Sequence, residues 1–104
     1  MQPILTEQEI EMVLYQVQHP EIRFSLVELG MFAGAEIEGE NATVLIALPT
    51  LEVPEAIREY IRKTVIQAIG QLEPAARCSV RFVNMTEEPR QRFLALAREG
   101  WIDQ

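Results

Sequence analysis

The sequence predicts an α/β (α+β) fold: one compact domain in the order α-β-β-α-β-α, with helices packed on a three-stranded mixed sheet. Two observations predict it. Segments with helical spacing of apolar residues alternate with short β-prone runs, and turn residues separate them. The 104 residues, 48% hydrophobic and 24% charged, also suit a globular chain with its own core. Residues 1–104 are therefore expected to form a single domain.

The first predicted element is an amphipathic helix that begins after Thr6. Thr6 and Glu9 have the spacing of a capping box, in which each side chain binds the backbone N–H of the other residue. Apolar residues then recur at helical spacing at Ile10, Val13, Leu14 and Val17. Pro20 disfavours helical backbone before it, so the helix is expected to end near Gln18 or His19.

A β-hairpin follows. Ser25 and Glu28 can cap a short turn, which Gly30 would leave in a left-handed conformation. Residues 31–38 form a weak strand pattern, residues 39–41 supply turn chemistry, and residues 43–48 are strongly β-prone. The second strand is apolar on both faces apart from its first residue, so we expect it to be central or covered on both sides.

The second half of the chain predicts a helix, a strand and a last helix. Pro54 suits the first turn of the second helix, whose end Gly70 and Pro74 mark. Residues 77–82 alternate as in a half-buried strand, and the last helix covers about residues 86–100. Because strand–helix–strand crossovers are right-handed, the third strand should run parallel to the second. If it lies beside the first strand, the sheet is mixed. Gly100 and Trp101 suit a glycine cap with a hydrophobic lid.

Composition excludes several classes of protein. Nine basic and sixteen acidic residues give a net charge of −7, which provides no general attraction for nucleic acid. The apolar runs are too short to span a membrane, and the first residues do not resemble a signal peptide. A single cysteine, Cys78, excludes an internal disulfide and a self-contained cysteine cage, so we expect a cytoplasmic protein.

Three short segments carry a resemblance to a known family. They are His19-Pro20-Glu21-Ile22, Val27-Glu28-Leu29-Gly30 and the loop Leu48–Pro54. With the order of elements, they resemble the iron–sulfur cluster assembly family that includes SufT, the PaaD-like proteins and the N-terminal domain of Mrp-type ATPases. That family has an Asp-Pro-Glu segment, a Val-Asp/Glu-Leu-Gly segment and a Leu-Thr-Thr-x-Gly-Cys-Pro-type loop at these places. The resemblance runs from about residue 6 to about residue 83.

Two departures from the family pattern fall where its chemistry is expected. Val53 replaces the loop cysteine, and His19 replaces the aspartate of the first segment. A thiol at a helix N-terminus is easily deprotonated, whereas valine can neither ligate iron nor exchange a sulfide. The C-terminal helix matches no part of the family pattern. The resemblance therefore implies a divergent member, in which the positions of the family motif form a partner surface: His19, Pro20, Glu21, Glu28, Gly30, Thr50, Val53 and Pro54.

Each candidate residue also has a structural interpretation. Cys78 alternates with polar neighbours and should point into the core; the alternative is a metal ligand that bridges a dimer, or a reactive thiol. His19 can cap the first helix, or act as a replacement ligand or base. Glu21 and Glu28 can act as paired carboxylates, or as caps or salt-bridge partners. No phosphate loop, nucleophile elbow or metal-binding helix motif is present, and no catalytic residue is predicted.

The C-terminal aromatic residues leave two alternatives open. Phe93 and Trp101 are expected to cover the sheet or the first helix. Alternatively, Trp101, Ile102 and Met85 form an exposed patch for a partner.

The resemblance implies a non-enzymatic accessory factor in iron–sulfur cluster assembly or delivery, which acts through contacts with scaffold or client proteins. No cofactor is predicted, and a transient cluster would need ligands from a second chain. The alternative is a structural or regulatory interaction module without cluster chemistry, which could be homodimeric. A third class, a small hydrolase or metal enzyme that uses His19 and the glutamates, is the least favoured.

Overall fold

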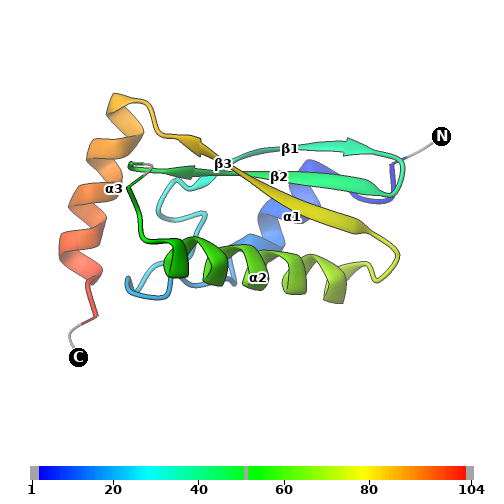
Figure 1. The fold of residues 1–104 in the computed structure, drawn as a ribbon, viewed down its shortest axis with the longest axis horizontal. Helices are drawn as coiled ribbons and strands as arrows, with labels where there is room; N and C mark the ends of the chain where they lie inside the picture. Colours follow the sequence, from blue (N-terminus) through cyan, green and yellow to red (C-terminus); the bar gives the residue numbers. More distant parts are fainter. Residues whose placement is uncertain (1–2, 51, 103–104) are drawn as a thin grey trace.

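Strand β2 (Asn41–Leu48) lies at the centre of a three-stranded sheet, antiparallel to β1 (Phe32–Glu38) and parallel to β3 (Arg77–Asn84). The computed structural model describes residues 3–50 and 52–102. The helices are α1 (Glu7–Leu14), α2 (Glu55–Leu72) and α3 (Glu87–Gly100) (Figure 1). The predicted order of elements, the mixed sheet and the parallel third strand are confirmed. The third strand lies beside the second strand and not beside the first.

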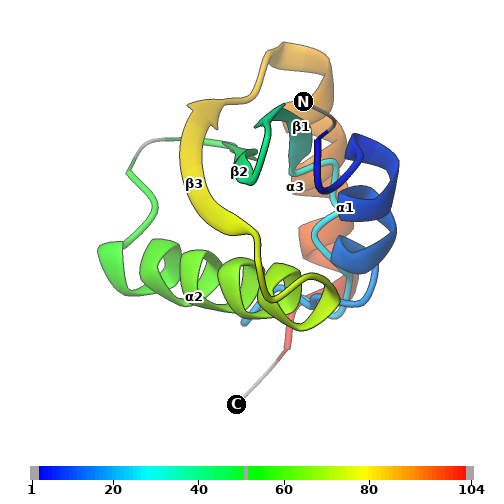
Figure 2. The same cartoon turned by 90° about the vertical axis from the view of Figure 1, so that its right-hand side faces the viewer.

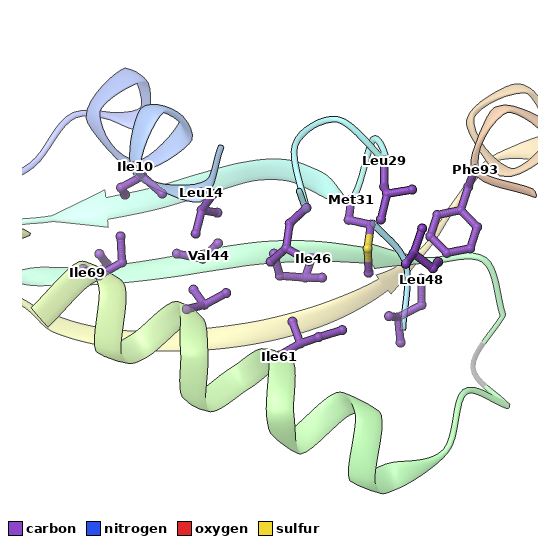
Figure 3. Packing of buried hydrophobic residues seen from close by; sticks show 14 of the residues in the cluster. Ile10, Leu14, Leu29, Met31, Val44, Ile46, Leu48, Ile61, Ile69 and Phe93 are labelled. Atoms are coloured by element: carbon purple, nitrogen blue, oxygen red, sulfur yellow. The ribbon is translucent and has the colours of Figure 1, made fainter. Parts of the chain in front are cut away.

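The core lies between the sheet and helices α1 and α2, which cover the same face of the sheet (Figure 2). Paired rows across the three strands, such as Phe32, Ile46 and Phe82, point toward these helices. Figure 3 shows how the helices meet the strands in one cluster. Its fully buried members include Ile10, Leu14, Val44, Ile46, Ile61 and Ile69. Each such side chain contributes about 1.5–3 kcal/mol through burial.

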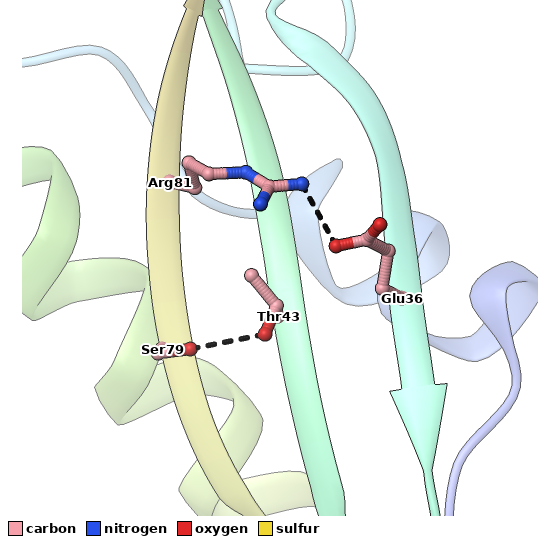
Figure 4. A network of polar contacts seen from close by, with 4 residues as sticks. All are labelled: Glu36, Thr43, Ser79 and Arg81. Carbon is pink, nitrogen blue, oxygen red and sulfur yellow. Dashed lines mark hydrogen bonds and ion pairs between the residues drawn. The ribbon is translucent and has the colours of Figure 1, made fainter.

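The opposite face of the sheet carries a polar network (Figure 4). Arg81 on β3 donates to Glu36 on β1 at 2.8 Å and so spans the central strand. The hydroxyl groups of Thr43 and Ser79 lie 3.2 Å apart on the neighbouring strands. Both ionic side chains are more than half exposed, so the pair contributes about 0–1 kcal/mol to stability.

Helix α1 begins as predicted but ends earlier than predicted. The capping box is present: Thr6 Oγ1 accepts from the Glu9 N–H at 3.1 Å, and Glu9 Oε1 accepts from the Thr6 N–H at 2.9 Å. The helix ends at Leu14, not near Gln18 or His19. The following residues instead pair with the segment around Ser25, through bonds such as Leu26 N–H to Val17 C=O. This tertiary pairing overrides the helical pattern.

The hairpin region follows the predicted turn chemistry. Glu28 Oε1 accepts from the Ser25 N–H at 2.8 Å, Ser25 Oγ accepts from the Glu28 N–H at 3.1 Å, and Gly30 has a φ of +74°. The weak strand pattern has a cause, because the register shifts between Phe32 and Gly34, and Gly34 has a φ of +130°. Such a φ is accessible mainly to glycine, so the small residues mark a β-bulge.

Helix α2 ends as predicted, whereas the ends of α3 differ from the prediction. Helix α2 ends at Leu72, between Gly70 and Pro74. Thr86 occupies the N-cap of α3 but makes no side-chain capping bond. Gly100 is not left-handed; it is the last helical residue, and Phe24 packs directly against it. Glycine is therefore needed at this position for close approach and not for chain reversal.

Adding a methyl group at Gly100 is expected to destabilise the protein. A Cβ there would lie 2.6 Å from Phe24 Cε2 and 3.3 Å from the Arg23 backbone nitrogen, so Gly100→Ala should cost about 1–2 kcal/mol despite the better helix propensity. The control is Gly70→Ala on α2, where nothing lies within 4 Å and stability should rise by about 0.5–1 kcal/mol. Urea denaturation of both variants tests this. Stabilisation by both substitutions would contradict the docked position of α3.

Candidate functional site

The first wall of the candidate site is the segment that begins at His19. The His19 side chain is buried, and its Nδ1 accepts a hydrogen bond from the Glu21 N–H at 3.0 Å. The proton of the neutral imidazole therefore sits on Nε2. Burial lowers the pKa of His19 to about 4, so the ring is uncharged at neutral pH. His19 lies five residues beyond the end of α1 and cannot cap it, so the predicted capping role is wrong.

The second wall is the loop that joins β2 to α2. Pro54 is the N-cap of α2 and makes no side-chain capping bond. Thr50 Oγ1 instead accepts from the Glu52 N–H at 3.2 Å inside the loop. Neither Thr50 nor Glu52 therefore caps α2 through its side chain. Val53, at the position of the family cysteine, lies directly before the N-cap and is half-buried.

Helix α3 supplies the third wall and is held at the end of the sheet next to the β2–α2 loop (Figure 1). The Gly100 C=O accepts from the Arg23 N–H at 2.8 Å, and the Glu21 C=O accepts from the Ile102 N–H at 3.0 Å. Phe93 is buried and meets the His19 ring edge-on, with 6.3 Å between ring centroids. The C-terminal helix is thus fixed against the His19–Phe24 segment on both sides of Trp101.

These walls enclose an apolar cavity of about 160 Å³. Four of the predicted family positions line it: His19, Glu21, Val53 and Pro54. The remaining lining residues are Ile22, Met31, Leu48, Pro49, Ile57, Ile61, Phe93 and Trp101. The cavity opens to solvent, because Pro54 is exposed and Trp101 is 51% exposed. The fold therefore brings together the first family segment and the loop, as the resemblance implies.

The other predicted positions do not line this cavity. Glu28 is engaged with Ser25, and Gly30 forms the left-handed end of the same turn. Thr50 is exposed in a separate shallow groove beside Asn84 and the start of α3. Pro20 precedes Glu21 but is absent from the lining. Glu21 and Glu28 thus do not line the same cavity, as a pair of cooperating carboxylates would have to.

Sequence reasoning missed the contribution of the C-terminal segment to the site. Phe93 packs into the core cluster at the end of the sheet, as predicted, and it also lines the cavity beside His19, as Trp101 does. The patch of Trp101, Ile102 and Met85 is not formed, because Met85 lies at the opposite end of α3, about 20 Å away. The only signal was the apolar pair Trp101–Ile102 directly after an amphipathic helix.

The single thiol lies far from the candidate site. Cys78 pairs with the buried Ala42 near the hairpin end of the sheet, and it packs against the core as predicted. Burial raises the pKa of its thiol to about 11. Six residues along the strands separate this row from Leu48, a distance of about 20 Å. Across residues 3–50 and 52–102, no three His, Cys, Asp or Glu side chains form a group that could hold a metal ion.

Comparison with known proteins identifies the family. Residues 7–82 match the family described as iron-sulfur cluster assembly protein. The chain belongs to the iron-sulfur cluster assembly protein family. The matched region includes the His19–Ile22 segment and the loop, both of which line the cavity, and it ends before α3. The resemblance noted in the sequence is thereby confirmed.

Two individual proteins extend this comparison. The chain is 32% identical over 91 residues to an iron-sulfur cluster carrier protein of Synechocystis sp., covering 88% of this chain and 25% of the relative. It thus spans about a quarter of that relative's length. The fold of the chain is similar to that in the crystal structure of a domain of unknown function, DUF59, from Bacillus anthracis, with a TM-score of 0.67 and 22% identity. That similarity covers 88% of this chain and 91% of the other. Within the described residues, no helix is long and apolar enough to cross a membrane.

Proposed function

We propose that this chain is a non-enzymatic accessory factor in iron–sulfur cluster assembly or delivery, and that it acts by binding protein partners at the cavity. One observation carries the proposal. Val53, at the position of the family's loop cysteine, forms the wall of an open apolar cavity together with Glu21 and the half-exposed Trp101. Apolar cavities with an exposed aromatic rim are typical of protein interfaces and unsuited to iron ligation.

The partners expected from this function are cluster scaffolds or client proteins in the cytoplasm. A homodimer is a second candidate assembly, formed through one of the edge strands of the sheet, β1 or β3. The cluster itself would be cargo, held only with ligands that a second chain supplies. Membership of the family and the name of the Synechocystis relative support the cluster-assembly part of the proposal.

Affinity purification from the source cells tests the proposed function. The tagged chain should recover a cluster-assembly protein or an iron–sulfur client in reproducible excess over a tag-only control. Quantitative mass spectrometry of three independent preparations provides the measurement. Recovery of neither class of protein, in cells where the tagged chain replaces the untagged one, would contradict the proposal.

Anaerobic reconstitution with iron and sulfide is expected to leave the isolated chain colourless. Its one thiol is half-buried, has a pKa raised by burial, and lies far from the cavity. Iron content and visible absorption after desalting provide the measurement, with Cys78→Ser as the control. Colour and iron that Cys78→Ser abolishes would show a cluster shared between copies of this chain, and would contradict the role assigned to Cys78.

A second candidate function is a structural or regulatory interaction module on the same fold, with no part in cluster chemistry. The loss of the loop thiol at Val53 favours it, as does α3, which lies outside the family match and forms one wall of the cavity. This candidate predicts partners that neither hold nor build iron–sulfur clusters. The affinity purification described above separates it from the first proposal.

A further inference from the structure

The size and lining of the cavity indicate what it can accept. It measures about 160 Å³ and is walled mainly by aliphatic and aromatic side chains. A cavity of about 150 Å³ lined by leucine, isoleucine and phenylalanine is large enough to hold benzene. This cavity can therefore hold one aliphatic or aromatic side chain. Protein interfaces often concentrate their binding energy in such a single buried anchor.

The cavity can be reached from outside. The exposed Pro54 and the half-exposed Trp101 stand on two different walls of its mouth. An anchor side chain that enters between them would bury part of the indole ring. It would also contact Val53, at the position where the family pattern has cysteine.

Among the described residues, no lysine or arginine lines the cavity, and Glu21 is the one carboxylate that does. The stretches 19–22, 48–57 and 101–102 contain three glutamates and no basic residue, whereas the α3 wall carries Arg92 next to Phe93, and Arg90 lines the neighbouring groove with Glu52. Glu21 lines the cavity, and Glu52 and Glu55 flank Val53 and Pro54. None of these three carboxylates takes part in an ion pair within residues 3–50 and 52–102. An approaching lysine or arginine would therefore be attracted without first breaking an ion pair.

We propose that the cavity binds a protein partner by taking up one leucine-, isoleucine- or phenylalanine-sized side chain that lysine or arginine residues flank in the partner. The inference rests on the proposed function and specifies the chemistry of its partner. The apolar cavity selects the anchor, and the three glutamates select the basic neighbours. The neutral state of His19 adds no positive charge that would oppose them.

Selection from a phage-displayed library of random twelve-residue peptides tests the inference on the full chain. Enriched peptides should share an apolar residue with lysine or arginine within two positions. Trp101 is the only tryptophan of the chain, so its emission reports binding of the synthesised, tryptophan-free peptides directly. Replacing the apolar anchor of a peptide by alanine should weaken binding about tenfold or more.

Two variants of the protein locate the binding site. Val53→Phe should fill the cavity and weaken binding of the selected peptides about tenfold or more. The double variant Glu52→Lys, Glu55→Lys should weaken it about three- to tenfold at low salt. The matched control is Glu38→Lys, Glu40→Lys, which makes the same change in net charge beside the hairpin turn at the far end of the sheet. That control should bind nearly as well as the unchanged chain.

The inference is overturned if no peptide is enriched, if enriched peptides lack the basic flank, or if Val53→Phe binds them undiminished. Equal weakening of peptide binding by the two double charge reversals would also overturn it. The attraction for basic peptides would then come from the net charge of the chain and not from the glutamates near the cavity. These results leave the proposed function intact as long as affinity purification recovers a cluster-assembly protein. If the purification recovers no cluster-assembly protein or client but the selected peptides bind as expected, the cavity would instead belong to an interaction module without cluster chemistry.

Discussion

Replacing Phe93 by alanine is expected to lower the free energy of unfolding by about 3–5 kcal/mol, the largest loss predicted for a single side chain of α3. The Phe93 ring is 6% exposed, packs edge-on against His19 and lines the cavity. Its removal leaves a void between α3 and the sheet and breaks the aromatic contact. Urea denaturation followed by circular dichroism provides the measurement.

The matched control lies next to it on the same helix. Leu94 is 45% exposed, so Leu94→Ala should change stability by about 0.5 kcal/mol or less. If the two substitutions had the same small effect, α3 would not be docked on the domain. The third wall of the cavity would then be absent in solution.

Acidification from pH 7 to pH 5 is expected to cost about 1–2 kcal/mol of stability through His19 alone. Burial lowers the pKa of this residue from 6.5 to about 4, so the unfolded chain takes up a proton in this range while the folded chain does not. The contribution of neutral His19 is fully present above pH 6.5. It is lost progressively as the pH falls toward 4.

His19→Asn isolates this effect from the sixteen side-chain carboxyl groups of aspartate and glutamate. Asparagine keeps an oxygen that can accept from the Glu21 N–H but does not titrate. The difference between the pH dependence of the unchanged chain and that of His19→Asn should therefore equal the histidine contribution. Identical slopes between pH 7 and pH 5 would show that His19 is not buried in the neutral form.

The sequence was sufficient to predict the structure wherever contacts between neighbouring residues determine it. The capping box at Thr6 and Glu9, the reciprocal turn of Ser25 and Glu28, and the left-handed Gly30 all depend on contacts within a few residues. The apolar pattern of residues 43–48 likewise identified the central strand, since only that strand has neighbours on both sides.

Contacts between distant segments explain what the sequence did not show. Helix α1 ends early because the residues after it pair with the segment around Ser25. Gly100 looked like a helix cap, but its neighbour is Phe24, which is 76 positions earlier in the chain. The periodicity of a single segment contains no information about such partners.

The candidate site was predictable in part. The family segments indicated that His19, Glu21, Val53 and Pro54 belong together, and all four line the cavity. The roles of Phe93 and Trp101 were not predictable, because α3 lies outside the residues that match the family. Its position depends on backbone bonds to Glu21 and Arg23, which no motif encodes.

Affinity purification of three forms of the chain tests the central claim most directly: the unchanged protein, Val53→Asp and Cys78→Ser, each with a thermal unfolding curve to confirm folding. The claim is that this family member works through contacts at its cavity and not through its thiol. Cys78→Ser should recover the same cluster-assembly proteins as the unchanged chain, whereas Val53→Asp should lose at least nine-tenths of them, a tenfold weakening. Retention by Val53→Asp together with loss by Cys78→Ser would contradict the claim.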